Sequence, residues 1–223
     1  MMNRLIIDKV RGCLLGGAIG DALGYSVEFN MLRDIRRIYG ESGITFYTFN
    51  ESGEAEISDD TQMTMYTANG LLMYMSEKLK HNEEPEESGV GVVECIHAAY
   101  MEWLKTQKAR FDRVREVDFK CWITNDPRMW AVRAPGNTCM SALGSHKIGS
   151  RENKLNSSKG CGGVMRVAPI GIYMHQLGLD YVEVLKLGCD AAAITHGHPC
   201  GYLAAGLFAD IIARLLYSQN LLQ

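Results

Sequence analysis

Two adjacent aspartates stand among side chains that carry oxygen atoms in the segment SDDTQM. Asp59 and Asp60 lie between Ser58 and Thr61, so four consecutive side chains offer oxygen ligands. Adjacent carboxylates repel each other, and a helix N-terminus supplies only about half a positive charge to compensate. A divalent cation compensates better, and oxygen ligands suit Mg²⁺ or Mn²⁺ rather than zinc. The simpler interpretation is a capping box, in which Asp59 and Gln62 close the start of a helix.

Two more carboxylates flank the segment GDALGYSVEF. Asp21 follows a nearly uncharged run, where a buried carboxylate requires hydrogen bonds or a partner, so it either ends a helix or supports a site. Glu28 lies between Val27 and Phe29, and apolar surroundings there would raise its pKa and suit acid–base chemistry. A surface glutamate is the simpler interpretation of Glu28.

A glycine-rich segment, NSSKGCGGVMRVAPIG, is a third candidate. Gly160, Gly162 and Gly163 allow successive backbone N–H groups to turn toward an anion, and a helix beginning at Val164 would add its positive end. The motif order of a P-loop is absent, and such glycines also serve flexible loops. Cys161 is a candidate thiol nucleophile, although nothing in the sequence indicates a lowered thiol pKa.

Two histidines follow in the segment ITHGHPCG, where a helix is expected to end. His196 and His198 would interact favourably with the negative end of that helix, which is the simpler interpretation. A pair of histidines two residues apart also suits a metal, although two ligands alone are a weak signal.

Helical patterns dominate the elements that must position these residues. Apolar residues recur every three to four positions, and no strand alternates with them, so we expect one all-α domain. The expected helices cover residues 6–23, 31–39, 59–79, 92–107, 137–144, 164–178, 180–197 and 199–218, with loops at 80–89 and 145–163, a connector at 43–50, and short helices and turns at 108–136.

Local signals refine several of these helices. Four glycines in the first helix, at positions 12, 16, 17 and 20, predict that another element packs closely against it. Gly40 is expected to end the second helix, and Asn137 to cap the helix at 137–144. Pro169 predicts a kink or break, and Asp180 with Glu183 predicts a capping box.

Composition excludes several classes of protein. The 223 residues carry a net charge of −3, which gives no basic footprint for nucleic acid. The seven cysteines are odd in number and lack C-x-x-C spacing, which indicates a reduced, cytoplasmic chain without a zinc site. The glycine-rich N-terminus does not fit a signal peptide, and charged and histidine residues interrupt the apolar stretch at 191–216, so we expect no membrane span.

Taken together, five segments resemble the motifs of the ADP-ribosylglycohydrolase family, the group that includes the dinitrogenase-reductase-activating glycohydrolase. They occur in the order of the family across nearly the whole chain, and five ordered matches are far more specific than one. The segments are GCLLGGAIGDALGYSVEF, SDDTQM, APGNTCMSAL, SKGCGGVMRVAPIG and AAITHGHPCGYLAAGL.

The resemblance implies a compact fold of orthogonally packed helices with a binuclear Mg²⁺ or Mn²⁺ centre in a cleft. It also implies hydrolysis of the bond between ADP-ribose and a modified side chain. By this resemblance Ser58, Asp59 and Asp60 are metal ligands, and Glu28 and Asp60 are the catalytic residues. The residues expected to hold ADP-ribose are Ser157, Ser158, Gly160, Gly162, Gly163 and His196.

One departure from the family pattern bears on activity. The family carries a second aspartate-rich motif, G-x-D-x-D-[ST], near its C-terminus, and this sequence contains none. Asp210 lies in an ordinary amphipathic pattern instead. We therefore expect a C-terminally incomplete single domain over residues 1–223, with half of the ligand set missing and with apolar surface available for self-association.

Three functions remain open from the sequence. The first is a metal-dependent hydrolase acting on an ADP-ribosylated protein or a small ADP-ribose conjugate. The second is a family member that binds ADP-ribose without hydrolysing it. The third is a thiol hydrolase using Cys161 with His196.

Overall fold

The computed structural model describes residues 4–81, 91–114 and 119–217 of the chain, and within these ranges it contains helices and no strand. The all-α prediction is therefore confirmed for the described residues. The α-helices are α1 (Arg4–Tyr25), α2 (Leu32–Tyr39), α3 (Asp59–His81), α4 (Val92–Lys108), α5 (Asn137–Gly144), α6 (Ala168–Ile172), α7 (Met174–Leu177), α8 (Tyr181–Ala193) and α9 (Pro199–Tyr217). Short 3₁₀ helices are η1 (Phe111–Arg113), η2 (Trp122–Asn125), η3 (Pro127–Trp130) and η4 (Cys161–Arg166).

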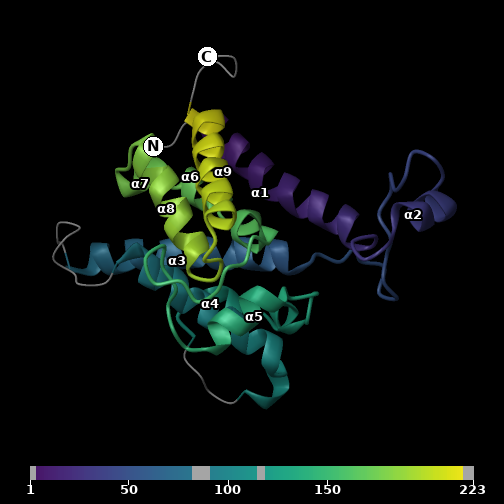
Figure 1. The fold of residues 1–223 in the computed structure, drawn as a ribbon, viewed down its shortest axis with the longest axis horizontal. Coiled ribbons are helices and arrows are strands. Elements are labelled where there is room, and N and C mark those ends of the chain that lie inside the picture. Colours follow the sequence, from purple (N-terminus) through teal and green to yellow (C-terminus); the bar gives the residue numbers. More distant parts are fainter. Residues whose placement is uncertain (1–3, 82–90, 115–118, 218–223) are drawn as a thin grey trace.

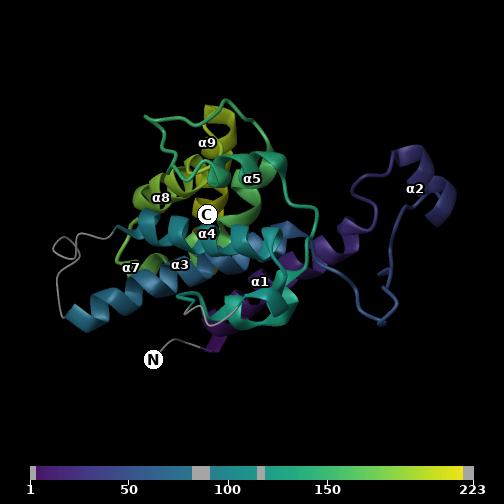
Figure 2. The ribbon, with the colours of Figure 1, turned by 90° about the horizontal axis from the view of Figure 1, so that it is seen from below.

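Two pairs of helices form the body of the fold. Helix α3 lies along α4, and α8 lies along α9, while η4 and α6 contact both α3 and α9 and so join the pairs (Figure 1). Figure 2 shows α3 and α4 side by side from below. The core between them is built on large, fully buried side chains, including those of Tyr66, Tyr100, Trp103 and Ile170. Removing this apolar surface from water is the main stabilising contribution, at roughly 25 cal/mol per Å².

Helix α1 lies at the margin of this body rather than within it. Among its residues only Ala22 is buried. Its four glycines at positions 12, 16, 17 and 20 have no atom within 4 Å of the place where a side chain would begin. The expected close packing against these glycines is therefore wrong for the described residues. Lys9 anchors the helix instead, donating hydrogen bonds from Nζ to the carbonyl oxygens of Leu215 (3.0 Å) and Leu216 (3.2 Å).

Helix α2 and the connector after it extend away from the body (Figures 1 and 2). No residue of α2 is buried. Gly40 ends the helix with a φ of +87°, as its sequence position predicts. Residues 43–50 form no strand, which confirms that this segment is a connector.

The predicted helix at 164–178 is divided into η4, α6 and α7. Pro169 lies in the first turn of α6, where a residue without an N–H group costs no helical hydrogen bond. Gly136, not Asn137, occupies the N-cap position of α5. Asn137 is the first residue of the helix, and its side chain makes no capping hydrogen bond. The capping box of Asp180 and Glu183 is confirmed, with both of its hydrogen bonds 2.8 Å long.

Other boundaries also differ from the pattern. Helix α8 ends at Ala193 instead of continuing to residue 197, so His196 and His198 lie in the turn between α8 and α9. The short helices η1, η2 and η3 confirm the expectation for residues 108–136 within the described part. The acidic loop expected at 80–89 lies mostly outside the described residues, since α3 is described as far as His81.

Within the described ranges, helix α9 is the one segment that reaches the length and apolar composition of a membrane span. In the fold it packs against α8, α6 and η4, and seven of its residues are buried. Asp210, one of these seven, forms an ion pair with Arg214 one turn later, at 2.8 Å. These features are those of a core helix that exposes one apolar face.

Candidate active site

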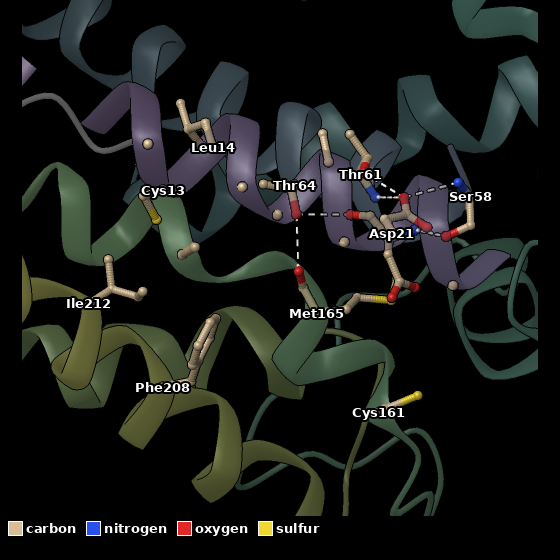
Figure 3. A pocket seen from close by; sticks show the side chains of 18 of the residues that line it. Cys13, Leu14, Asp21, Ser58, Thr61, Thr64, Cys161, Met165, Phe208 and Ile212 are labelled. Carbon is tan, nitrogen blue, oxygen red and sulfur yellow. Dashed lines mark hydrogen bonds between the residues drawn. The ribbon is translucent and has the colours of Figure 1, made fainter. Parts of the chain in front are cut away.

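The end of α1 meets the start of α3 through the carboxylate of Asp21. Its Oδ2 atom accepts hydrogen bonds from the backbone N–H groups of Ser58 (2.9 Å) and Thr61 (3.2 Å) and from the Thr61 hydroxyl (2.5 Å) (Figure 3). The first N–H groups of a helix have no partner within it, so Asp21 stabilises the start of α3 from another helix. Asp21 is therefore a capping carboxylate that also fixes the position of Ser58 and Asp60.

The capping box expected from Asp59 and Gln62 is wrong. Ser58 precedes the first residue of α3, and its Oγ atom accepts the hydrogen bond from Asp60 N at 3.1 Å. Gln62 turns into the core, where its side chain bonds to Ala131 O (3.0 Å) and accepts from Trp103 Nε1 (3.1 Å). The serine completes the cap, which leaves both aspartates available for another task.

The two aspartates point to different surroundings. Asp59 is buried, and its Oδ2 atom accepts a hydrogen bond from Gly136 N at 3.0 Å. Ala134, two residues before Gly136, has a φ of +50°, a conformation that non-glycine residues seldom adopt. This turn delivers the Gly136 N–H group to Asp59. Asp60 lines the large groove beside α1, as described below.

Burial and the charges of neighbouring carboxylates raise the pKa values of both aspartates to about 6. Loss of hydration is the largest cause in each case, and the negative charges of Glu28 and Asp21 add to it. For Asp59, the hydrogen bond from Gly136 opposes this shift, while Asp60 adds to it. The four carboxylates thus share one electrostatic field that a positive charge would relieve.

By the resemblance described above, a divalent metal ion would lie at the start of α3. Ser58, Asp59 and Asp60 offer the oxygen atoms that Mg²⁺ and Mn²⁺ prefer. Burial, with a smaller contribution from neighbouring carboxylates, raises the pKa values of both aspartates, and a bound cation would oppose this shift. Within the described ranges no three His, Cys, Asp or Glu side chains converge into a metal-holding group. Mg²⁺ commonly takes only one or two carboxylates and completes its shell with water and phosphate oxygens. The residues present fit an ion held in that way.

A groove of about 1070 Å³ runs from these carboxylates along α1. One wall is α1, the other is formed by η4 and by α9 residues that include Phe208 and Ile212 (Figure 3). Glu28 and Asp60 line its acidic end, and Cys161 lies opposite. Glu28 is exposed, and Phe29 beside it is 77% exposed, so the apolar surroundings expected for Glu28 are absent.

The glycine-rich loop runs into η4, which contains Gly162 and Gly163, and it is tied to the turn between α8 and α9. Asn156 makes this link, donating from Nδ2 to Thr195 O (2.7 Å) and accepting at Oδ1 from Ser158 N (2.9 Å). The Ser158 hydroxyl oxygen in turn accepts from Gly160 N at 3.2 Å. Ser157 is exposed at the start of the loop. Sequence patterns gave no indication of the part that Asn156 plays.

Gly162 and Gly163 are required for close approach rather than for unusual backbone angles, since neither has a positive φ. A side chain at Gly162 would begin 2.8 Å from His196 Cε1 and 3.1 Å from the Cys139 sulfur. One at Gly163 would begin 3.0 Å from Ala192 Cβ. These glycines let the loop rest directly on the end of α8.

Beneath this loop, His196 is only 2% exposed. Burial, together with the positive charge of Arg166, lowers its pKa to about 4, so the ring is neutral at pH 7. His198 faces another way and accepts a hydrogen bond from Cys200 N at Nδ1 (3.0 Å), in the first turn of α9. The two histidines therefore do not form a metal-binding pair.

The acidic end of the groove and the glycine-rich loop are joined by one short segment. Gly136 bonds to Asp59, and Thr138, two residues later, shares a hydrogen bond between its hydroxyl group and that of Ser158 at 3.1 Å. The structure thus connects the residues expected to hold a metal with those expected to hold ADP-ribose. In the described part of the chain no hydrogen bond joins Cys161 to His196, as a thiol hydrolase would require.

The described residues form an all-helical fold with a carboxylate-lined groove beside a glycine-rich loop. Comparison with known families identifies the class of protein that has these features. The family model for ADP-ribosylglycohydrolase matches residues 2–222. The chain belongs to the ADP-ribosylglycohydrolase family.

A curated relative extends this comparison. An uncharacterized protein of Archaeoglobus fulgidus is 27% identical over 193 residues, which is 85% of this chain and 50% of the relative. The chain thus spans about half the length of the relative that it matches. No solved structure was found to match it.

Proposed function

We propose that this protein is a metal-dependent hydrolase that releases ADP-ribose from a modified protein side chain or a small conjugate. Family membership supports hydrolysis of ADP-ribose conjugates as the reaction class. The observation that carries the proposal is the group of carboxylates at one end of an open groove, where Asp21, Glu28 and Asp60 line the groove and the buried Asp59 adjoins Asp60 in the chain. That end suits a cation and a sugar whose bond is being cleaved.

Each residue has a role in this proposal. Ser58, Asp59 and Asp60 would hold Mg²⁺ or Mn²⁺, which when bound orients the ribose diol and lowers the pKa of water. Asp60 also contributes negative charge near a sugar that becomes oxocarbenium-like, and such charge stabilises that state.

Glu28 is exposed and lines the acidic end of the groove, where its carboxyl group can reach a bound sugar, which suits an acid–base group. The glycine-rich loop, with the residues predicted above and His196, would hold the diphosphate. Glu28→Gln is expected to lower turnover by about 10²–10⁴-fold while ADP-ribose affinity is retained.

The test is the release of free ADP-ribose from an ADP-ribosylated protein or a small conjugate, with added Mg²⁺ or Mn²⁺. We expect release that stops after thorough chelation and in Asp60→Asn. Asp8→Asn, which removes a carboxylate on exposed α1, is the matched control and should retain activity. Turnover that survives chelation would contradict the metal requirement.

A second candidate is a protein that binds ADP-ribose without cleaving it. It is favoured by the finding that no three metal-binding side chains converge within the described ranges. Calorimetric titration with ADP-ribose, run beside the release assay, separates the two functions. Binding without product would support this candidate.

We also propose a cytoplasmic location for the protein. All seven cysteines are free, and five of them are buried or half-buried, which suits a reducing compartment. The partner is then an ADP-ribosylated intracellular protein or conjugate. Fractionation of cells that express the protein, with a periplasmic or secreted marker for comparison, tests the location.

A further inference from the structure

Arg166 is a fully buried cation without a carboxylate partner among the described residues. Its guanidinium lies over the Tyr100 ring, 4.3 Å from the ring centre, and donates to Ala191 O at 3.1 Å. Its Nε atom has no hydrogen-bond partner. Burying an arginine without a counter-ion costs several kcal/mol, and its hydrogen bonds and its contact with the Tyr100 ring offset part of that cost.

Among the hydrogen bonds that Arg166 donates to described residues, the shortest is to Thr195. Arg166 Nη2 lies 2.7 Å from Thr195 Oγ1, and because arginine only donates, the hydroxyl oxygen is the acceptor. The hydroxyl proton of Thr195 is then free to be donated. His196 Nδ1 lies 2.9 Å from the same oxygen, and the other acceptor nearby, the Cys139 sulfur, is a weak one.

The hydrogen bonds from Arg166 to Thr195 and from Thr195 to His196 decide which ring nitrogen of the histidine carries its proton. When Thr195 donates to Nδ1, the single proton of the neutral ring lies on Nε2. The adjacent positive charge polarises the Thr195 hydroxyl and strengthens its donation to Nδ1. The ring then presents an N–H donor on the side away from Arg166.

The Nε2 side of the ring faces the glycine-rich loop. A Cβ atom added to Gly160 would lie 3.4 Å from His196 Nε2 and 3.3 Å from Ser158 Oγ. Gly160 is exposed, so this point opens to solvent. In the described part of the chain no hydrogen bond is formed to Nε2, and Nε2 is not among the buried side-chain atoms that lack a partner. The Nε2 atom therefore faces an open position in the loop and is available to a ligand.

We propose that Arg166 and Thr195 are positioning residues that hold His196 as the Nε2–H tautomer, which donates to a phosphate oxygen bound between Ser158 and Gly160. The identity of the ligand rests on the proposed function, whereas the assignment of the His196 tautomer does not depend on it. It assigns Arg166 and Thr195 a role in recognising the diphosphate although neither side chain reaches the ligand.

The first test measures the tautomer without any ligand. ¹⁵N NMR of the imidazole ring distinguishes the protonated nitrogen, and the His196 signals are those absent from His196→Gln. We expect Nε2 to carry the proton in the wild type and in Thr195→Ser, which keeps the hydroxyl. Thr195→Val keeps the shape of the side chain but removes the donor, and should lose this preference. Protonation at Nδ1 in the wild type, or an unchanged tautomer in Thr195→Val, would overturn the proposal.

The second test measures the contact to the ligand. ADP-ribose should shift the Nε2–H signal of the wild type, and its affinity should fall roughly tenfold in Thr195→Val but stay within about twofold in Thr195→Ser. Thr106→Val, which removes another buried hydroxyl far from His196 along the chain, should leave both unchanged. Binding of ADP-ribose that leaves the Nε2–H signal unmoved would refute the contact.

The two proposals can fail separately. If ADP-ribose does not bind at all, the proposed function fails, whereas the tautomer is still decided by the first test. Inorganic pyrophosphate, titrated in the same way, then decides the contact. A shifted Nε2–H signal supports it, and an unshifted signal at saturating pyrophosphate or no binding of pyrophosphate overturns it.

Discussion

Asp59 and Asp60 are neighbours in the chain but have different partners. Asp59 gives one oxygen to Gly136 N, which fixes the segment that leads to Thr138 and the glycine-rich loop. Asp60 lines the groove, and its own backbone N–H group is held by Ser58. At the scale of residues, Asp59 therefore links the two parts of the site, and Asp60 is the side chain most available to a cation.

Asp60→Asn should change stability in a manner that depends on pH and on metal. The folded-state pKa of Asp60, about 6, exceeds its ordinary value of 3.8, so ionising it in the fold costs free energy as the pH rises through this range. At pH 7 in chelator we expect the variant to be more stable by about 1–2 kcal/mol, after allowance for partial exposure. Chemical unfolding measures the difference, which should shrink as the pH falls through 6 and vanish well below the unfolded-state pKa of 3.8.

Mn²⁺ should remove the same cost in the wild type by supplying positive charge. We expect Mn²⁺ to raise the melting temperature of the wild type and of Asp8→Asn, but not that of Asp60→Asn. An equal rise in Asp60→Asn would place the metal elsewhere.

Neutral His196 makes the fold sensitive to acid. The folded-state pKa of His196, about 4, lies below the ordinary value of 6.5. Between pH 4 and pH 6.5, His196 is therefore protonated in the unfolded chain but neutral in the folded protein. The contribution is fully present above pH 6.5 and is lost as the pH falls toward 4. Between pH 7 and pH 5 the wild type should lose about 2 kcal/mol more stability than His196→Gln, as measured by urea unfolding. Parallel losses in the two proteins would show that His196 is not the group responsible.

At the scale of elements, glycine has different structural roles in η4 and in α1. Gly162 lies on His196 and Cys139, so it allows η4 and its loop to rest on the end of α8. Gly16 lies on α1 with no atom near its side-chain position. Adding a methyl group should therefore lower the free energy of unfolding at Gly162 and raise it at Gly16.

Gly162→Ala should destabilise the protein by about 1–3 kcal/mol and weaken ADP-ribose binding, because the new methyl group would begin 2.8 Å from His196 Cε1. Gly16→Ala is the matched control and should stabilise by up to about 1 kcal/mol, since alanine favours a helix over glycine. Thermal unfolding and calorimetric titration measure both effects. A neutral Gly162→Ala would show that the loop is free to move away from His196.

Local patterns predict most of the elements and the chemistry of the acidic end. Apolar periodicity placed α3, α4 and α9 within a few residues, end signals placed α5, and the capping box of Asp180 depends on neighbours along the chain. Ser58 and Asp60 were identified because oxygen-bearing residues adjoin a helix start. The packing of α1 failed as a prediction, since glycines in a helix indicate close approach without showing whether another element is present.

Long-range contacts explain what the patterns missed. Gly136 N lies 77 positions along the chain from the carboxylate that it binds, and Arg166 reaches Thr195 across 29 positions. An arginine within the apolar run VMRVAPIG was the one available signal for the second contact. Its partner depends on how η4 crosses the end of α8, which no local pattern encodes.

At the scale of the whole molecule, the groove beside α1 is open and apolar over much of its length. Leu14 lines it at 38% exposure, and Leu15 and Ile19 on the same helix are 61% and 54% exposed. The curated relative has about as many residues outside the match as within it. Exposed apolar surface of this kind favours association.

We therefore expect the protein to self-associate as its concentration rises. Leu14→Arg places a charge in the groove and should shift association to concentrations at least about tenfold higher. Leu79→Arg, at an exposed leucine of α3 outside the groove, is the control and should associate as the wild type does. Sedimentation velocity over a range of concentrations measures this. A monomeric wild type at every concentration, or an equal effect of both variants, would contradict the expectation.

The most direct measurement is an anomalous difference map from crystals soaked with Mn²⁺ and ADP-ribose. We expect a manganese peak at the Asp60 carboxylate in the groove, with the diphosphate beside Ser158 and Gly160. A nucleotide bound elsewhere, or an acidic end that holds only water at saturating Mn²⁺, would contradict it.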